Sequence, residues 1–350
     1  YPERYDDLSD IAKNGFSPYQ LYNTADLMGE DYFKGYAGMK SIDKLEFPRD
    51  YGPHNDFQCG WYFFSSSFKD QNGKYVDLLV LFTRRAIYPP PIAEAMNLSE
   101  MDNQIIDFQI ALGLGDRNLF ISDFNPVISG KTGLIEMKAQ PFLVRIGKNE
   151  IKSVRADSLF PMTINAYDPK NDIKIDLTLE ATKPLFLQGD DGKLPDMFNL
   201  GTWYFSVPGI KTTGTINYAG DKRTVSGKTW FDNQWTAGVF PAGYPNSYYI
   251  RSLSNMMNGM KGKPADPWAW DWLQIQLDNN IDFTLASMHS SRSEDLKNLG
   301  SSPPENATRD VTGKMIDEQG RAEEVEGTVT IDRWVKSDVS GAWHPNGWIV

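Results

Sequence analysis

Two aspartates of this chain lie in short runs that are rich in tryptophan. Asp232 belongs to residues 230–235, WFDNQW, and Asp271 belongs to residues 268–272, WAWDW. A carboxyl group surrounded by indole rings loses contact with water, which disfavours its charged form and raises its pKa. Such a group remains an acid near neutral pH and can donate a proton or a hydrogen bond to a bound molecule. We therefore expect a pocket for a hydrophobic ligand, with both aspartates as catalytic residues.

The position of each aspartate along a strand sets what it faces, because alternate residues of a strand share one face of the sheet. A strand through the first run places Asp232 with Trp230 and Gln234, opposite the other three side chains of the run. A strand through the second run places Asp271 on a face with leucine and isoleucine, where an unpaired carboxylate is costly. A β-bulge in either strand would invert these assignments.

The alternative is that each aspartate is structural. A buried carboxylate is usually bound to backbone amides, to an arginine, for which Arg251 is a candidate, or within a turn. Two carboxylates in matching aromatic settings favour a functional role for the pair. The residues alone leave both interpretations open.

Further candidate pocket residues are aromatic or polar and lie in the two runs or on other predicted strands. Tyr249 and Arg251 alternate on one such strand, where they line either a cavity or the packed face of a sheet. The expected substrate-binding set is Trp61, Tyr62, Phe64, Trp230, Asn233, Gln234, Trp235, Tyr249, Arg251, Trp270, Trp272 and Trp343.

Composition and missing motifs exclude several classes of function. A formal net charge of −11 argues against nucleic-acid or anionic-membrane partners, which require a basic surface, and no apolar run is long enough to span a bilayer. The three histidines are isolated, which predicts no metal site. Without a P-loop, a dinucleotide-binding glycine motif or a Gly-x-Ser-x-Gly elbow, the chain predicts no cofactor and no hydrolase triad. The lone Cys59 excludes an intrachain disulfide and is expected to be a buried small hydrophobic residue.

Two features bear on localisation. N-glycosylation sequons begin at Asn97 and Asn306, and the chain begins at Tyr1 rather than at methionine. Both features are typical of a secreted or periplasmic protein from which a leader has been removed. We expect such a location, although a cytoplasmic one is also compatible with the sequence.

Short β segments separated by Gly, Pro, Asn and Asp make up most of the chain, and helical patterns are scarce. Residues 173–180 alternate apolar and polar without interruption, which is typical of a half-buried strand. Asn72-Gly73 predicts a hairpin turn. Many strands at roughly ten-residue spacing predict an all-β fold of sandwiches or barrels.

A short internal repeat predicts two domains. The tripeptide Trp-Tyr-Phe occurs at residues 61–63 and again at residues 203–205, in a chain longer than one hydrophobic core usually is. The polar, turn-rich segment 188–195 lies between the two copies. We therefore expect an N-terminal β domain over residues 1–192 and a C-terminal β domain over residues 193–350.

Three motifs together resemble a known family. They are Trp-Tyr-Phe-Phe at residues 61–64, Gly-x-x-Trp-x-Asp-x-Gln-Trp at residues 227–235, and Trp-Asp-Trp at residues 270–272. In order and spacing they resemble the lipocalin-like carotenoid hydratase family over most of the chain. That group includes hydroxyneurosporene synthase, AttH-type proteins, kievitone hydratase and the fungal lipocalin-like Diels–Alderases.

The resemblance implies two lipocalin-like β-barrel or β-sandwich domains packed side by side, with few short helices. It also implies a hydrophobic pocket in or between them and no cofactor. Family members hydrate an isolated prenyl alkene or fold a polyene for [4+2] cycloaddition. In the hydratases an aspartate protonates the alkene, and its motif position corresponds to Asp232 or Asp271. Many members carry histidine after the first aspartate, whereas this chain carries Asn233, which removes a potential proton relay.

These observations favour a cofactor-independent pericyclase of the Diels–Alderase type, acting on a polyketide- or terpenoid-type molecule in secondary metabolism. Such an enzyme needs no acid–base triad, and holding a flexible substrate in its reactive shape can supply about 7–11 kcal/mol. One alternative is a hydratase with aspartate as general acid. A further alternative is a carrier that binds a lipophilic molecule without transforming it.

Overall fold

The computed structural model describes residues 35–124, 128–194, 202–236, 268–290, 301–305, 307–338 and 341–350. The chain divides into two compact units, Tyr1–Arg251 (unit 1) and Ser252–Val350 (unit 2). Strands dominate both units, and the predicted all-β class is confirmed. The described helices are short: η1 (Met39–Ser41), η2 (Arg49–Tyr51), α3 (Pro90–Ala95), η3 (Gly115–Arg117) and η4 (Gly130–Thr132).

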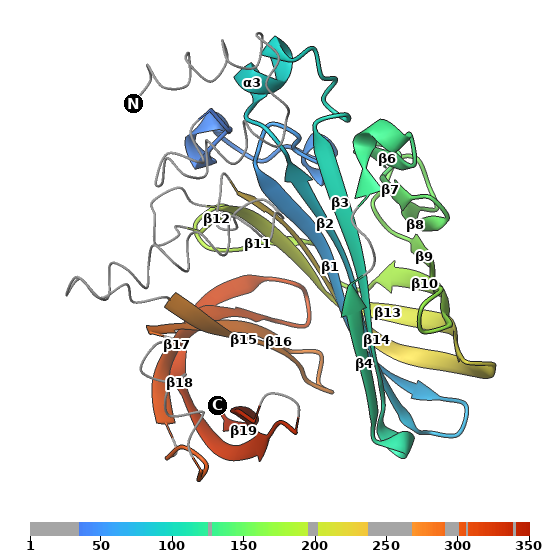
Figure 1. Cartoon of the computed structure of the whole chain (residues 1–350). Coiled ribbons are helices and arrows are strands. Elements are labelled where there is room, and N and C mark those ends of the chain that lie inside the picture. Colours follow the sequence, from blue (N-terminus) through green and yellow to red (C-terminus); the bar gives the residue numbers. More distant parts are fainter. Residues whose placement is uncertain are drawn as a thin grey trace. The chain divides into compact units, whose positions relative to one another are not determined.

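The described part of unit 1 forms one antiparallel sheet of 14 strands (Figure 1). The strands are β1 (Cys59–Asp70), β2 (Tyr75–Ala86), β3 (Gln104–Leu114), β4 (Leu119–Phe124), β5 (Ile128–Ser129), β6 (Ile135–Lys138), β7 (Leu143–Ile146), β8 (Asn149–Ser153), β9 (Met162–Asp168), β10 (Ile173–Ala181), β11 (Phe186–Leu187), β12 (Lys193–Leu194), β13 (Thr202–Tyr218) and β14 (Asp221–Thr236). Their order is β4-β3-β2-β1-β14-β13-β10-β9-β8-β7-β6, with β5 beside β3 and with β11 and β12 beside β13. The long strands β1, β13 and β14 lie at the middle of this order.

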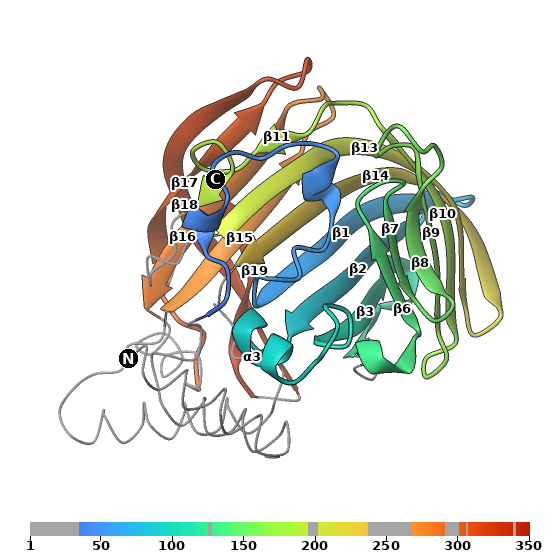
Figure 2. The same ribbon diagram turned by 90° about the horizontal axis from the view of Figure 1, so that it is seen from above.

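The sheet of unit 1 curls around a single hydrophobic core, as the view from above shows (Figure 2). Core side chains come from strands near opposite ends of the sheet, among them Val80 and Ile110 at one end and Val144 and Ile164 at the other. The alternation predicted for residues 173–180 is confirmed in β10, where the odd-numbered residues of this range are buried and the even-numbered ones are exposed. One face of the curled sheet therefore packs against the core, and alternate side chains point to the other face.

Unit 2 contains a five-stranded antiparallel meander among its described residues. Its strands are β15 (Trp268–Gln276), β16 (Asp282–Ser290), β17 (Ala307–Ile316), β18 (Ala322–Lys336) and β19 (Trp343–Ile349). A small core of Leu285, Val311 and Val329 packs on one face, together with Leu273 and Ile275 of β15. Each unit thus buries its own apolar face.

The domain boundary expected between residues 192 and 193 differs from the division of the structure. β13 and β14 follow that boundary, yet they pair with β10 and β1 and belong to unit 1. The repeated Trp-Tyr-Phe tripeptide does not mark two domains. Its copies lie in β1 and β13, which flank β14 in one sheet, so that Trp61 and Tyr204 both pair with Gln234.

Two sequence expectations concern single residues. Cys59 is free and buried, as expected, and burial raises the pKa of its thiol. The predicted turn at Asn72-Gly73 joins β1 to β2, and Gly73 adopts the positive φ of 74° that this turn requires. No helix among the described residues is long and apolar enough to cross a membrane.

His54 anchors the segment after η2 onto β14. Its ring stacks on that of Trp235, with ring centroids 3.8 Å apart, and lies edge-on to Phe57. Burial lowers the pKa of His54 to about 4, although the neighbouring Asp50 carboxylate acts in the opposite direction. The His54 ring is therefore neutral in the folded protein at neutral pH.

We predict that this histidine makes the protein less stable in acid. Between about pH 6.5 and pH 4 the unfolded chain binds a proton at His54 that the folded chain does not. The free energy of unfolding therefore falls as the pH drops through this window, by on the order of 3 kcal/mol for the full shift. In urea unfolding at pH 7 and pH 4.5, His54→Asn should lose less stability than the wild type, since asparagine tolerates the positive φ of 46°.

The control for this measurement is His344→Asn, at an exposed position of β19. It should lose as much stability as the wild type between the two pH values. An equal loss in His54→Asn and the wild type would show that another group causes the acid sensitivity.

Candidate functional site

Asp232 lies in the middle strand of the sheet of unit 1, where three long strands are paired in register. Asp232 is opposite Phe63 of β1 on one side and opposite Ser206 of β13 on the other. The predicted alternation along the first tryptophan-rich run is confirmed, because Trp230 and Asp232 share the face of Ser206 while Phe231 belongs to the core cluster on the opposite face. Asp232 is nevertheless buried, with 1% of its surface exposed.

Hydrogen bonds hold the Asp232 carboxyl group in place. Its Oδ1 atom accepts a hydrogen bond from the Ser206 hydroxyl and one of 2.9 Å from Trp230 Nε1. Gln188 Nε2 in turn donates to Ser206 Oγ at 2.9 Å, which directs the single hydroxyl proton of Ser206 toward the carboxyl group. Both of these hydrogen bonds to the carboxyl group are accepted by Oδ1, which fixes the orientation of the Asp232 side chain.

Tyr204 completes this group of polar residues. The pKa of its phenol is raised well above the ordinary value, first by burial and then by the charge of Asp232 and a hydrogen bond to it. The Tyr204 hydroxyl therefore stays protonated and acts as a hydrogen-bond donor. We call Gln188, Tyr204, Ser206, Trp230 and Asp232 the Asp232 cluster. Burial favours a neutral Asp232, whereas these donors favour the charged form, so the two effects oppose each other.

Aromatic side chains surround the Asp232 cluster. Trp61 and Phe63 of β1 are half-buried and, by register, share the face of Asp232. The ring of Phe186 in β11 lies edge-on to Trp230, with ring centroids 5.9 Å apart. This arrangement matches the expected setting of a carboxyl group among aromatic rings, and Trp61 and Trp230 are two of the predicted binding residues.

The predicted binding residues do not all lie on this face. Tyr62, Phe64, Asn233 and Trp235 alternate with the residues of the Asp232 face, so they point toward the core of unit 1, where Phe64 stacks on Phe231. Asn233 Nδ2 and Trp235 Nε1 are buried there without a hydrogen-bond partner. A buried donor without a partner costs about 1–3 kcal/mol, so two of them on one strand require an explanation.

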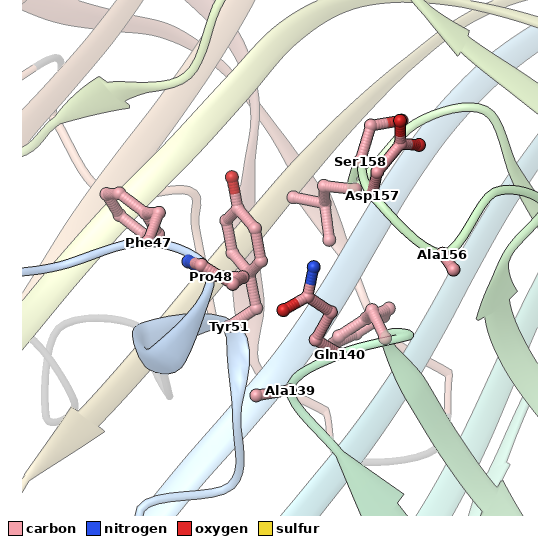
Figure 3. A pocket seen from close by; sticks show the side chains of 10 residues that line it. Phe47, Pro48, Tyr51, Ala139, Gln140, Ala156, Asp157 and Ser158 are labelled. Carbon is pink, nitrogen blue, oxygen red and sulfur yellow. The ribbon is translucent and has the colours of Figure 1, made fainter.

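A pocket of about 250 Å³ opens on the core side of the sheet (Figure 3). We call it the inner pocket; its lining includes Phe47, Tyr51, Gln140, Phe142, Asp157 and Ser158. The ring of Phe205 contacts the rings of Phe47 and Tyr51, at centroid distances of 5.2 and 6.0 Å. Since Phe205 lies between Tyr204 and Ser206 in β13, the inner pocket and the Asp232 cluster are on opposite faces of the same strands.

Asp271 occupies a different environment from Asp232. It lies in β15 of unit 2, in the same alternating set as Leu273 and Ile275, as predicted, and forms an ion pair with Arg309 of β17. Both side chains are largely buried, and burial lowers the pKa of the Arg309 guanidinium. An ion pair of this kind is made by the ionised carboxylate. The structural alternative that pairs an aspartate with an arginine thus applies to Asp271, with Arg309 as the partner.

The remaining predicted binding residues are distributed as follows. Gln234 is half-buried on the face of Asp232. Trp272 donates from Nε1 to Thr284 Oγ1 at 3.1 Å, and Trp343 of β19 lies under Lys336 Nζ at 5.7 Å; both belong to unit 2. Tyr249, Arg251 and the side chain of Trp270 lie outside the described residues.

The structure describes one of the two predicted N-glycosylation sequons. Asn97 is exposed in the turn after α3. Asn306 lies outside the described residues. Glycosylation and a secreted location remain predictions.

No group of three or more His, Cys, Asp or Glu side chains within the described ranges is placed to hold a metal ion.

Sequence reasoning missed part of the Asp232 cluster. The sequence indicated Tyr204 only as part of the repeated Trp-Tyr-Phe tripeptide, and no sequence pattern indicated Ser206 or Gln188 as site residues. The alternation Tyr204-x-Ser206 does place two hydroxyl groups on one strand face. What brings them to Asp232 is the pairing of β13 with β14, which no local pattern specifies.

Comparison with solved structures supports the fold. The crystal structure of an AttH from Nitrosomonas europaea is similar with a TM-score of 0.64 and 19% identity, covering 88% of this chain and 81% of that chain. Kievitone hydratase from Nectria haematococca is similar with a TM-score of 0.55 and 16% identity, covering 89% of this chain and 78% of that chain. At these identities the likeness concerns the fold.

The sequence itself is matched by a family model. The model described as AttH-like matches residues 39–247, which is more than half of the chain and includes the whole Asp232 cluster. No curated relative matches. The chain therefore belongs to the AttH-like family.

Proposed function

We propose that this protein is a cofactor-independent enzyme that hydrates an alkene of a hydrophobic small molecule, with Asp232 as the proton donor. The observation that carries this proposal is the Asp232 carboxyl group, buried among aromatic rings with Oδ1 held by Ser206 and Trp230. Burial among aromatic rings favours the protonated acid, and the hydrogen bonds to Oδ1 hold the carboxyl group in a fixed orientation for proton transfer.

The reaction begins with transfer of the carboxyl proton of Asp232 to the less substituted carbon of the alkene. The π electrons form the new C–H bond and leave a carbocation on the more substituted carbon. Water adds to that carbon through its oxygen and loses a proton, which returns to the Asp232 carboxylate. The product contains one molecule of water more than the substrate, and Asp232 is regenerated as an acid.

The surrounding residues suit such a cationic intermediate. Faces of aromatic rings attract cations, and Trp61, Phe63 and Trp230 belong to the same side of the sheet as the acid. Once Asp232 has given up its proton, the donors Ser206 and Trp230 stabilise the carboxylate that remains. Tyr204, which keeps its proton, adds a third donor to that carboxylate.

Similarity to known proteins adds support of two kinds. Membership of the AttH-like family covers the segment that contains the acid. One structural neighbour is named as a hydratase, and its fold aligns over most of this chain. The geometry and this neighbour favour hydration over the cyclisation that the sequence favoured.

A second candidate uses the same donors for a [4+2] cyclisation. The Tyr204 hydroxyl is held protonated, so it can donate a hydrogen bond to a carbonyl of the dienophile, and the aromatic side chains can hold the substrate in its reactive shape. In this case Asp232 orients Tyr204 and is not consumed as an acid. The product is then an isomer of the substrate.

We predict that Asp232→Asn lowers hydration by about 10²–10⁴-fold, the usual contribution of a general acid. Asparagine keeps the size of the side chain but has no acidic proton. A dimethylallyl-substituted phenol is a suitable probe, and mass spectrometry in H₂¹⁸O detects the added water. Asp176→Asn, at an exposed position of β10, makes the same substitution outside the Asp232 cluster and should retain full activity.

The outcomes separate the two candidates. If the Asp232→Asn variant still adds water to the substrate, Asp232 is not the acid. An isomeric product in place of a hydrated one, with only a modest loss in Asp232→Asn, would support the cyclase. Asp271→Asn should keep hydration, because its ion pair with Arg309 leaves it no proton to give.

We predict that Ser206→Ala moves the alkaline limb of the pH–rate profile to higher pH. Alanine removes one donor from Asp232 Oδ1, so the charged carboxylate becomes less stable and the acid keeps its proton at higher pH. Measured kcat/KM from pH 5 to pH 9 gives this limb. A profile that drops in height without moving would show that Ser206 only supports the fold.

A further inference from the structure

The lining of the inner pocket has a buried apolar part and an exposed polar part. Phe142 and Leu159 are buried, whereas Gln140 and Asp157 are exposed. Figure 3 shows the amide of Gln140 pointing into the space that these side chains enclose. A ligand that fits this lining therefore offers both an apolar surface and a polar or charged group.

Two stacked aromatic rings form one wall of the inner pocket. The centroids of Phe47 and Tyr51 are 4.8 Å apart, with 30° between the ring planes, and both side chains are half-buried. Edge contacts with Phe205 hold the two rings in place. Figure 3 shows the Tyr51 ring between Phe47 and Gln140, so the face of the ring that Phe47 does not cover is turned toward the pocket. Faces of aromatic rings attract cations, and more strongly where water is partly excluded.

Asp157 gives the inner pocket its charge. Among the described residues of the lining it is the one carboxylate, and none of them is lysine, arginine or histidine. Within the described ranges Asp157 forms no ion pair, and Arg155, two residues earlier, is exposed and does not line the pocket. Burial raises the pKa of the Tyr51 phenol, which is therefore neutral at neutral pH. The lining thus carries a net negative charge.

Basic side chains that adjoin the lining in the sequence are bound to other carboxylates. Arg49 forms an ion pair with Asp50, with Nη2 and Oδ2 2.8 Å apart. Lys138 forms an ion pair with Glu136. Both cations are therefore compensated by their own partners, and the carboxylate of Asp157 is available to a cationic ligand.

We propose that the inner pocket binds a small organic ammonium ion that carries methyl groups on its nitrogen. The ammonium group lies against the face of the Tyr51 ring, with the Asp157 carboxylate as its counter-ion. The amide of Gln140 forms a hydrogen bond with a polar substituent of the ligand, such as a hydroxyl group. Methyl groups suit the buried part of the lining better than N–H groups do, because they leave no donor without a partner.

Size and charge restrict the ligand further. The volume of about 250 Å³ is below the range of about 300–1,000 Å³ that is usual for drug-sized ligands, which favours a small ion. The carboxylate of Asp157 disfavours an anion. The site is distinct from that of the proposed hydration, because the inner pocket and the Asp232 cluster are on opposite faces of β13 and β14.

A matched pair of ligands tests the requirement for a positive charge. Choline and 3,3-dimethylbutan-1-ol have the same shape, but a carbon atom replaces the charged nitrogen in the second. Isothermal titration calorimetry of the full chain should show about tenfold tighter binding of choline. High salt should reduce this preference, because it screens the attraction to Asp157. Equal affinity for the two compounds would overturn the proposal.

A matched pair of variants tests the counter-ion. Asp157→Asn should weaken choline about threefold, the usual size of an exposed ion pair, and should leave the alcohol unchanged. Asp43→Asn removes a carboxylate from an exposed position outside the lining and should leave both affinities unchanged. An unchanged choline affinity in Asp157→Asn, or an equal loss in both variants, would show that Asp157 is not the counter-ion.

The aromatic wall is tested by Tyr51→Leu. Leucine keeps an apolar side chain but has no ring, so the preference for choline should fall at least about threefold while the alcohol binds as before. The backbone oxygen of residue 51, which accepts a hydrogen bond from Tyr62, is retained. Circular dichroism melting confirms that the variant is folded. An unchanged preference in the folded variant would contradict contact with this ring.

A last pair of variants tests the location without altering the aromatic wall. Ala156 lines the pocket from an exposed turn, so Ala156→Trp should fill the pocket and weaken both ligands at least about tenfold. Val154→Trp, at an exposed position that does not line the pocket, should leave both affinities unchanged. Choline binding that Ala156→Trp leaves intact would overturn the proposal. Because binding is measured without an alkene, none of these results depends on the proposed hydration.

Discussion

The pairing of β13 with β14 is the constraint on which the rest of the structure of unit 1 depends. In this register Ser206 lies opposite Asp232, so one hydroxyl group satisfies a carboxyl group that is cut off from water. A slip of one residue would turn Asp232 into the hydrophobic core, where an unpaired carboxylate is very costly. The hydrogen bond and the register therefore stabilise each other, and β1 continues the arrangement on the other side of β14.

The alternation of side chains gives these strands two different chemistries. Asp232 and Asn233 are neighbours in sequence, yet one faces an acidic cluster with hydroxyl donors and the other faces an apolar core. The Asp232 cluster and the inner pocket thus lie on opposite faces of one sheet.

The two tryptophan-flanked aspartates show how environment divides similar motifs into different roles. Asp232 has neutral donors and aromatic neighbours, which leave room for a proton on the carboxyl group. Asp271 has a guanidinium partner, Arg309, which fits a permanently charged carboxylate. Matching aromatic surroundings in the sequence therefore do not imply matching protonation.

The sequence by itself determined the all-β class, the alternation around Asp232 and Asp271, and the family, because periodicity and short motifs are local properties. It did not determine the extent of unit 1 or the partners of the aspartates. Gln188 and Ser206 come 44 and 26 residues before Asp232, and Arg309 comes 38 residues after Asp271. Such contacts depend on strand order and register, which only the burial of the whole core decides.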